Sequence, residues 1–99
     1  MKLIDLQPFW LSPDVFIFRS PCGYRDWLTC KRVKMTIKEQ SRLIWHDNPQ
    51  YKEEEVVLTV ANFAWKFEGN DFNILTVTPS IDASKSGNWH GFITNGEVF

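Results

Sequence analysis

The chain has 99 residues and a hydrophobic content of 43%, which suits one globular domain with a modest core and is too little for two. Its net charge of −1 excludes the strong positive field of a protein that gathers polyanions. The apolar start is interrupted before a secretory signal could form, and no run reaches the roughly 18 apolar residues of a membrane span. We therefore predict one cytoplasmic domain over residues 1–99, without membrane association.

The first half of the chain predicts strands separated by a tight turn. Residues 15–18 form a short apolar run that ends at residues 20–23 (Ser-Pro-Cys-Gly), which is typical of a strand entering a turn. Further along, Val33, Met35 and Ile37 alternate with polar and basic residues. This period of two predicts a half-buried strand with a basic outer face.

Residues 37–46 fit two different elements. Thr36 and Glu39 have the spacing of a helix capping box. Leu43 and Trp45, in contrast, would share one face of a strand. Because the flanking pattern is that of strands, we favour a strand here and keep a helix as the alternative.

The second half predicts further strands and a closing hairpin. Apolar residues alternate over residues 55–60, and a second run over residues 63–67 leads into a turn of the type Glu-Gly-Asn-Asp. Residues 72–78 then form the returning strand, which Pro79 should stop. Residues 89–99 contain Asn-Gly between two short runs, the strongest local signal for a hairpin. The predicted fold is all-β: a small antiparallel sheet or a compact sandwich with a C-terminal hairpin.

Two segments carry a resemblance to a known group of proteins. Cys22 and Gly23 occupy the first, and the second contains a Pro-Ser-Ile turn at residues 79–81 followed by His-Gly-Phe-Ile at residues 90–93. Together they resemble a family of small uncharacterised bacterial and phage proteins with a Cys-Pro-Cys-Gly-Cys turn and a closing Cys-x-x-His segment. The resemblance covers about half of the chain. It implies an all-β fold pinned by a structural zinc site, and some members lie beside ubiquitin-like conjugation genes.

The chain departs from that family at the zinc ligands. Ser20, Tyr24 and Gly87 stand where the family has cysteines, and residues 31–60 resemble an insertion. The resemblance therefore implies a metal-site remnant of Cys22 and His90, which we expect to be unoccupied because structural zinc takes four nitrogen or sulfur ligands.

A complete zinc site would need the other cysteine and histidine of the chain. Cys30 and His46 could add the two missing ligands, but their spacing matches no compact zinc-finger pattern. We therefore predict no cofactor and keep zinc as the alternative.

Cys22 and His90 would also be the minimum pair for a cysteine hydrolase if they faced each other. Such a pair needs a group that orients the imidazole, and Asp82 and Asn88 are the nearest candidates in the sequence. The metal-site remnant explains Cys22 and His90 more simply. We therefore predict that the protein is not an enzyme.

The remaining feature is a basic stretch in the predicted insertion. We predict that it binds a partner through Lys31, Arg32, Lys34, Lys38, Arg42 and Trp45. The protein would be a non-enzymatic binding module for a larger protein, such as a phage-encoded inhibitor of host machinery like a CRISPR effector, acting in the host cytoplasm. The alternatives are a zinc-stabilised structural accessory domain and a binder of single-stranded nucleic acid. The sequence leaves the oligomeric state open.

Overall fold

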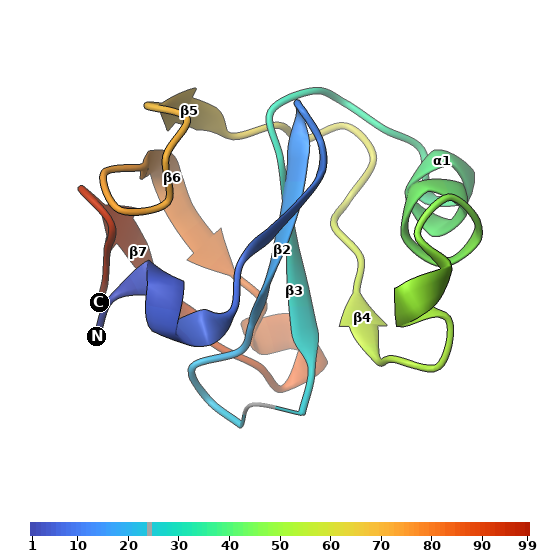
Figure 1. The fold of residues 1–99 in the computed structure, drawn as a ribbon, viewed down its shortest axis with the longest axis horizontal. Helices are drawn as coiled ribbons and strands as arrows, with labels where there is room; N and C mark the ends of the chain where they lie inside the picture. Colours follow the sequence, from blue (N-terminus) through green and yellow to red (C-terminus); the bar gives the residue numbers. More distant parts are fainter. Residues whose placement is uncertain (24) are drawn as a thin grey trace.

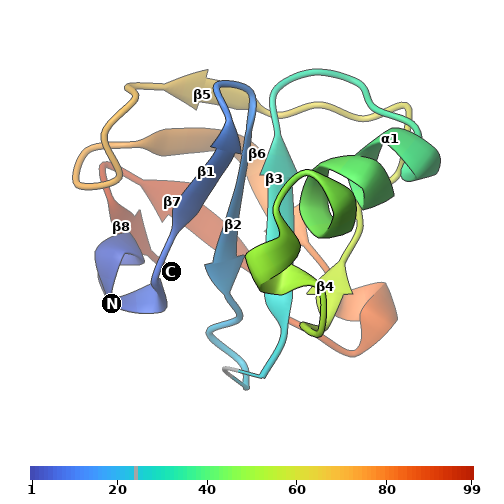
Figure 2. The ribbon, with the colours of Figure 1, turned by 45° about the vertical axis from the view of Figure 1, so that its right-hand side comes forward.

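Short apolar segments of this chain form strands, and the strands make two four-stranded sheets. The structure is a computed structural model that describes residues 1–23 and 25–99. The two sheets pack against each other around a shared core, and one short α-helix lies beside strand β4 (Figures 1 and 2). The prediction of a small all-β fold is confirmed.

The first sheet has the order β1-β2-β3-β4. Its strands are β1 (Phe9–Ser12), β2 (Val15–Arg19), β3 (Trp27–Lys31) and β4 (Val56–Val57). The first three are antiparallel neighbours, whereas β4 runs parallel to β3. The predicted strand at residues 15–18 is confirmed. The one predicted over residues 33–37 is wrong, and only two residues of the segment 55–60 pair as a strand.

The second sheet has the order β5-β6-β7-β8 and is antiparallel throughout. Its strands are β5 (Lys66–Glu68), β6 (Thr76–Asp82), β7 (His90–Thr94) and β8 (Glu97–Val98). Asn95 and Gly96 have φ angles of 48° and 75°, which are the left-handed angles of a two-residue hairpin turn, so the predicted hairpin is confirmed. The prediction that Pro79 ends a strand is wrong, because β6 continues through it to Asp82.

Helix α1 (Ile37–Ser41) corrects the preference for a strand over residues 37–46. Thr36 and Glu39 form both hydrogen bonds of a capping box, each 3.1 Å long, in which the two side chains accept from the backbone N–H groups of Glu39 and Thr36. A π-helical turn follows over Arg42–His46. Gln40 and Ile44 are spaced by one helical turn and are both buried, so local capping and burial outweigh the strand-like flanks.

The remaining helical segments are 3₁₀ turns. They cover Leu3–Leu6, Pro49–Tyr51 and Ser84–Ser86. Across residues 1–23 and 25–99, no helix has both the length and the apolar character needed to cross a membrane.

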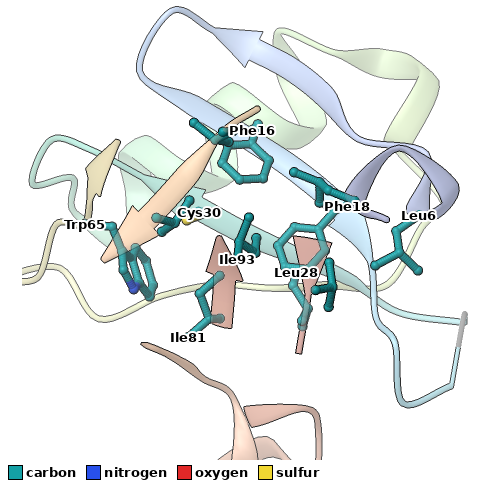
Figure 3. Close-up of a cluster of buried hydrophobic side chains, with 12 residues drawn as sticks. Leu6, Phe16, Phe18, Leu28, Cys30, Trp65, Ile81 and Ile93 are labelled. Carbon is teal, nitrogen blue, oxygen red and sulfur yellow. The ribbon is translucent and has the colours of Figure 1, made fainter. Parts of the chain in front are cut away.

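The core lies between the two sheets and takes side chains from both (Figure 3). Phe16, Phe18 and Leu28 come from the first sheet, and Ile81 and Ile93 from the second. Cys30 also belongs to this core and is fully buried. Desolvation raises the pKa of its thiol well above the ordinary value, with the charge of Lys31 opposing the shift. Cys30 is therefore a small core residue rather than the extra zinc ligand that the alternative required.

Candidate functional site

Three polar residues share the outer face of the second sheet because strand geometry alternates side chains. Ile81 points into the core and is 3% exposed, so its neighbours Ser80 and Asp82 point to the opposite face. Asp82 lies directly across from His90 on β7. Side chains of directly paired residues lie on the same face, and diagonal neighbours remain within reach. The side chains of Ser80, Asp82 and His90 therefore lie near one another on this face.

The pairing of β6 with β7 is irregular between Val77 and Ile81, the stretch that contains Ser80. Val77 pairs with Ile93 and Ile81 with Gly91, so β6 advances four residues where β7 advances two. An irregularity of this kind bends a strand and changes the direction of a side chain. Pro79 lies inside the irregular part, where the lack of an N–H group costs no regular ladder hydrogen bond. Ser80 lies in the same irregular part, directly after Pro79.

The Ser80 hydroxyl and the His90 imidazole are hydrogen-bonding neighbours. The distance from Ser80 Oγ to His90 Nε2 is 3.3 Å. Ser80 is half-buried and His90 is exposed. An imidazole nitrogen at this distance can accept the hydroxyl proton and so turn a weak nucleophile into a strong one, and such contacts are often longer in the free protein than with substrate bound.

Both members of the pair are held by buried or close-packed groups. The ring N–H of Trp65, which is only 7% exposed, donates to the carbonyl oxygen of Ser80 over 3.2 Å. Beside His90, a Cβ atom at Gly91 would collide with the carbonyl oxygen of Phe99 and the ring of Trp89. Glycine is therefore required next to His90, and the tight packing there fixes the course of β7.

Asp82 supplies a negative charge beside the pair. Its Oδ1 accepts hydrogen bonds from the side chain and backbone of Ser84, 2.5 and 2.9 Å long. These bonds hold the pKa of the Asp82 carboxyl below its ordinary value, and the charges of His90 and Lys85 lower it further. Asp82 is therefore ionised at neutral pH. It directs its hydrogen bonds to Ser84 rather than to His90, so its effect on the imidazole is electrostatic.

A groove of about 350 Å³ extends from Ser80 between β6 and the β3–β4 edge of the first sheet. Its walls are largely apolar and include Leu28, Val57, Leu58, Val60, Phe63 and Trp65. Ser80 and Asp82 line the groove, whereas His90 lies outside it. Ser80 thus lines an apolar groove, and its hydroxyl contacts an imidazole.

Cys22, the predicted partner of His90, lies in a turn of the first sheet rather than on the strands that carry Ser80 and His90. It is exposed in the turn after β2, and its backbone N–H donates to Ser20 Oγ over 3.1 Å. The turn borders a separate polar hollow of about 420 Å³. Asn88, one of the two orienting candidates, bonds the side chains of Ser20 and Asp26 instead of His90. Of the two candidates, only Asp82 lies by the imidazole.

The described part of the chain contains no group of three or more His, Cys, Asp and Glu side chains that could hold a metal ion. His46 contacts Asp47, with 2.9 Å between Nδ1 and Oδ1. Tyr24, one of the positions compared with the cysteine-rich family, falls outside the described residues. Cys22 and His90 are therefore not brought together with a third ligand.

The predicted partner-binding stretch needs one correction. Lys31 is fully buried, because its ammonium group is surrounded by three oxygen acceptors of the segment 59–63. Four other members are exposed, namely Arg32, Lys34, Lys38 and Arg42. Trp45 is half-buried and donates to the carbonyl oxygen of Glu54 over 3.3 Å. A partner surface on the exposed residues stays a prediction, and so does the nucleic-acid alternative.

Sequence reasoning named Ser80 only as part of a turn. The available signal was the spacing of Ser80 and Asp82 around apolar Ile81, which puts both on one face of a strand. The prediction that Pro79 ends the strand puts Ser80 in a turn, so it gives no reason to expect Ser80 and Asp82 on one strand face.

Comparison with known families gives one match. Residues 24–99, more than half of the chain, match the model of the family described as "Bacterial ubiquitination-like system serine protease (BubE)". No curated protein and no solved structure matches the chain. The match contradicts the prediction that the protein is not an enzyme, because the family is one of serine proteases. The resemblance to cysteine-rich proteins and the role as a phage-encoded inhibitor are not tested by it.

Proposed function

Because the chain belongs to the BubE family of bacterial ubiquitination-like system serine proteases, we propose that it is a serine peptidase with Ser80 as nucleophile and His90 as general base. The observation that carries the proposal is the 3.3 Å contact between Ser80 Oγ and His90 Nε2 at the end of the apolar groove. The described residues include all six serines, and among them Ser80 is the one whose hydroxyl contacts a histidine.

Acylation begins with transfer of the Ser80 hydroxyl proton to His90 Nε2 as Oγ attacks the carbonyl carbon of the scissile bond. The carbonyl π electrons move to oxygen and give a tetrahedral intermediate. When this intermediate collapses, the C–N bond breaks and His90 returns the proton to the leaving amine. The acyl group stays on Ser80 as an ester.

Deacylation repeats the same steps with water. His90 Nε2 takes a proton from a water molecule, and the resulting hydroxide attacks the ester carbonyl. Collapse of the second intermediate breaks the bond to Ser80 Oγ, which recovers its proton from His90. One water is consumed, and the products are a carboxylic acid and an amine.

Asp82 stabilises the charged form of His90 that exists during both steps. Its carboxylate is kept ionised by Ser84, and opposite charges on facing strand positions attract each other. The contact is through space rather than through a hydrogen bond. Asp82 is therefore an electrostatic helper whose loss should cost less than that of Ser80 or His90.

The substrate we propose is a polypeptide joined to, or extended beyond, a ubiquitin-like protein. This assignment takes its substrate class from the description of the family, and the open groove next to Ser80 offers space for an extended chain. Cleavage would release the ubiquitin-like protein with a free carboxylate.

The test is hydrolysis of p-nitrophenyl acetate, a small activated ester, by the wild type and by Ser80→Ala. We expect Ser80→Ala to lower kcat/KM by about a thousandfold or more, because the covalent intermediate can no longer form. Ser41→Ala, a hydroxyl removed from α1, is the matched control and should hydrolyse the ester at the wild-type rate. Equal rates for the wild type and Ser80→Ala would overturn the proposal.

A further inference from the structure

The groove beside Ser80 has a distinct chemical character along its length. Its wall over residues 58–65 is apolar except for Thr59. The charged residues that line the groove are Asp82, which precedes the 3₁₀ turn Ser84–Ser86, and Lys85, which lies in that turn; both are exposed. An ionised side chain placed against the wall of residues 58–65 would lose its water without gaining a charged partner from that wall, whereas an apolar side chain would gain by leaving water.

The position of His90 determines which half of a substrate enters this groove. His90 must return a proton to the leaving amine, so the leaving group has to lie on the His90 side of Ser80. His90 lies outside the groove, on the outer face of the sheet, while Ser80 forms part of the groove wall. The half of the substrate that stays bonded to Ser80 therefore extends the other way, into the groove.

The far wall of the groove is held in place before any substrate arrives. The buried Lys31 Nζ donates to Thr59 Oγ1, the Val60 carbonyl and the Phe63 carbonyl over 2.6, 2.8 and 2.6 Å. Gln40 is also buried, and its side-chain amide bonds both the N–H and the carbonyl of Thr59 at 3.0 and 2.8 Å. A wall fixed in this way gives the groove a defined shape, which is a condition for selecting among side chains.

We propose that this groove is the acyl-side subsite and that it selects a substrate with an uncharged, apolar residue immediately before the scissile bond. The inference rests on the proposed function and adds to it the direction of the bound chain and the chemistry of the residue accepted there. The volume of about 350 Å³ accommodates one large side chain together with neighbouring backbone.

The experiment compares p-nitrophenyl esters of N-acetylleucine, N-acetylglycine and N-acetylglutamate, which differ only in the side chain on the acyl side. We expect kcat/KM for the leucyl ester to exceed that for the glycyl ester by about tenfold or more, and the glutamyl ester to be the poorest. Val60, which is 71% exposed on the groove wall, offers a variant that should fold. In Val60→Lys the ratio of leucyl to glycyl kcat/KM should fall to near one. Val33→Lys, at a 40% exposed position away from the groove, should keep the wild-type ratio.

Two outcomes overturn the inference and can be told apart from failure of the proposed function. A small fluorophosphonate probe reports the reactivity of the Ser80 hydroxyl without requiring an amino-acid side chain in the groove. If the probe labels Ser80 but the wild type hydrolyses all three esters equally, the subsite is wrong while the nucleophile stands. The same conclusion holds if Val60→Lys keeps the wild-type ratio. If Ser80 is not labelled at all, the proposed function fails and the subsite fails with it.

Discussion

The turn that carries Cys22 and the strand pair that carries Ser80 and His90 are organised in different ways. At the turn, the backbone N–H of Cys22 bonds the Ser20 hydroxyl, and the neighbouring side chains bond one another. On β6 and β7, strand pairing places a hydroxyl and an imidazole within 3.3 Å and leaves both able to react. The role of His90 therefore depends on which residue lies next to it across the sheet.

The strongest test of this comparison removes the imidazole and the thiol separately. His90→Gln should lower kcat for p-nitrophenyl acetate by about a hundredfold to ten thousandfold, because glutamine cannot accept the Ser80 proton. Cys22→Ala should keep the wild-type rate, because its side chain lies in the other region. Steady-state kinetics on both variants gives the answer. A large loss in Cys22→Ala with little loss in His90→Gln would reverse the roles of the two regions.

The buried ammonium of Lys31 provides the next largest effect, on stability. Lys31→Met should lower the free energy of unfolding by about 3 kcal/mol, because it removes all three hydrogen bonds that the buried ammonium group donates to the segment 59–63. Lys34→Met is the matched control at an exposed position and should change stability by less than about 0.5 kcal/mol. Urea denaturation of both variants measures the difference. Equal stability would show that the groove wall does not depend on Lys31.

Two glycines allow the same substitution in the two regions. Gly91→Ala places a Cβ atom against the Phe99 carbonyl and the Trp89 ring, so we expect a loss of about 2 kcal/mol in unfolding free energy, with reduced activity from displacement of His90. Gly23→Ala, in the cysteine turn, meets no atom within 4 Å and should be close to neutral for both properties. Thermal unfolding and ester hydrolysis would be measured on the same samples. A neutral Gly91→Ala would contradict the close packing beside His90.

Asp82→Asn should have the smallest catalytic effect, a loss of about tenfold in kcat, because it removes a charge that acts without a hydrogen bond to the imidazole. The pKa of Asp82 is held below its ordinary value, so its carboxylate stays charged as the pH rises from about 5 to 9. The wild type should therefore be faster than Asp82→Asn at neutral pH. The difference should be lost when the pH falls through the pKa of Asp82, where the wild type loses the same charge. Equal rates for the wild type and Asp82→Asn at neutral pH would contradict this assignment.

Much of the fold could be predicted because strand alternation and turn chemistry are local. Residues 15–18 and the Asn95–Gly96 hairpin follow directly from such patterns. The helix at Ile37–Ser41 is only the alternative from the sequence, because its capping box competes with strand-like neighbours. The parallel pairing of β4 with β3 depends on contacts between distant segments, which periodicity does not report.

The site could be predicted only in part. His90 and Asp82 were both named from the sequence, but with Cys22 as the partner. Ser80 was missed because a proline inside a strand is uncommon, and a turn at Pro79 would separate Ser80 from the face that carries His90. Lys31 was placed on a surface because lysines are rarely buried, and three oxygen acceptors from a distant segment make it an exception.

The most direct measurement is mass spectrometry of the protein after reaction with a fluorophosphonate, followed by peptide mapping of the modified residue. The reagent reacts with hydroxyl groups that a neighbouring base has activated. The Ser80–His90 assignment predicts one adduct per chain on Ser80, absent in Ser80→Ala and strongly slowed in His90→Gln. No adduct on Ser80, or an adduct that forms equally fast in His90→Gln, would contradict it.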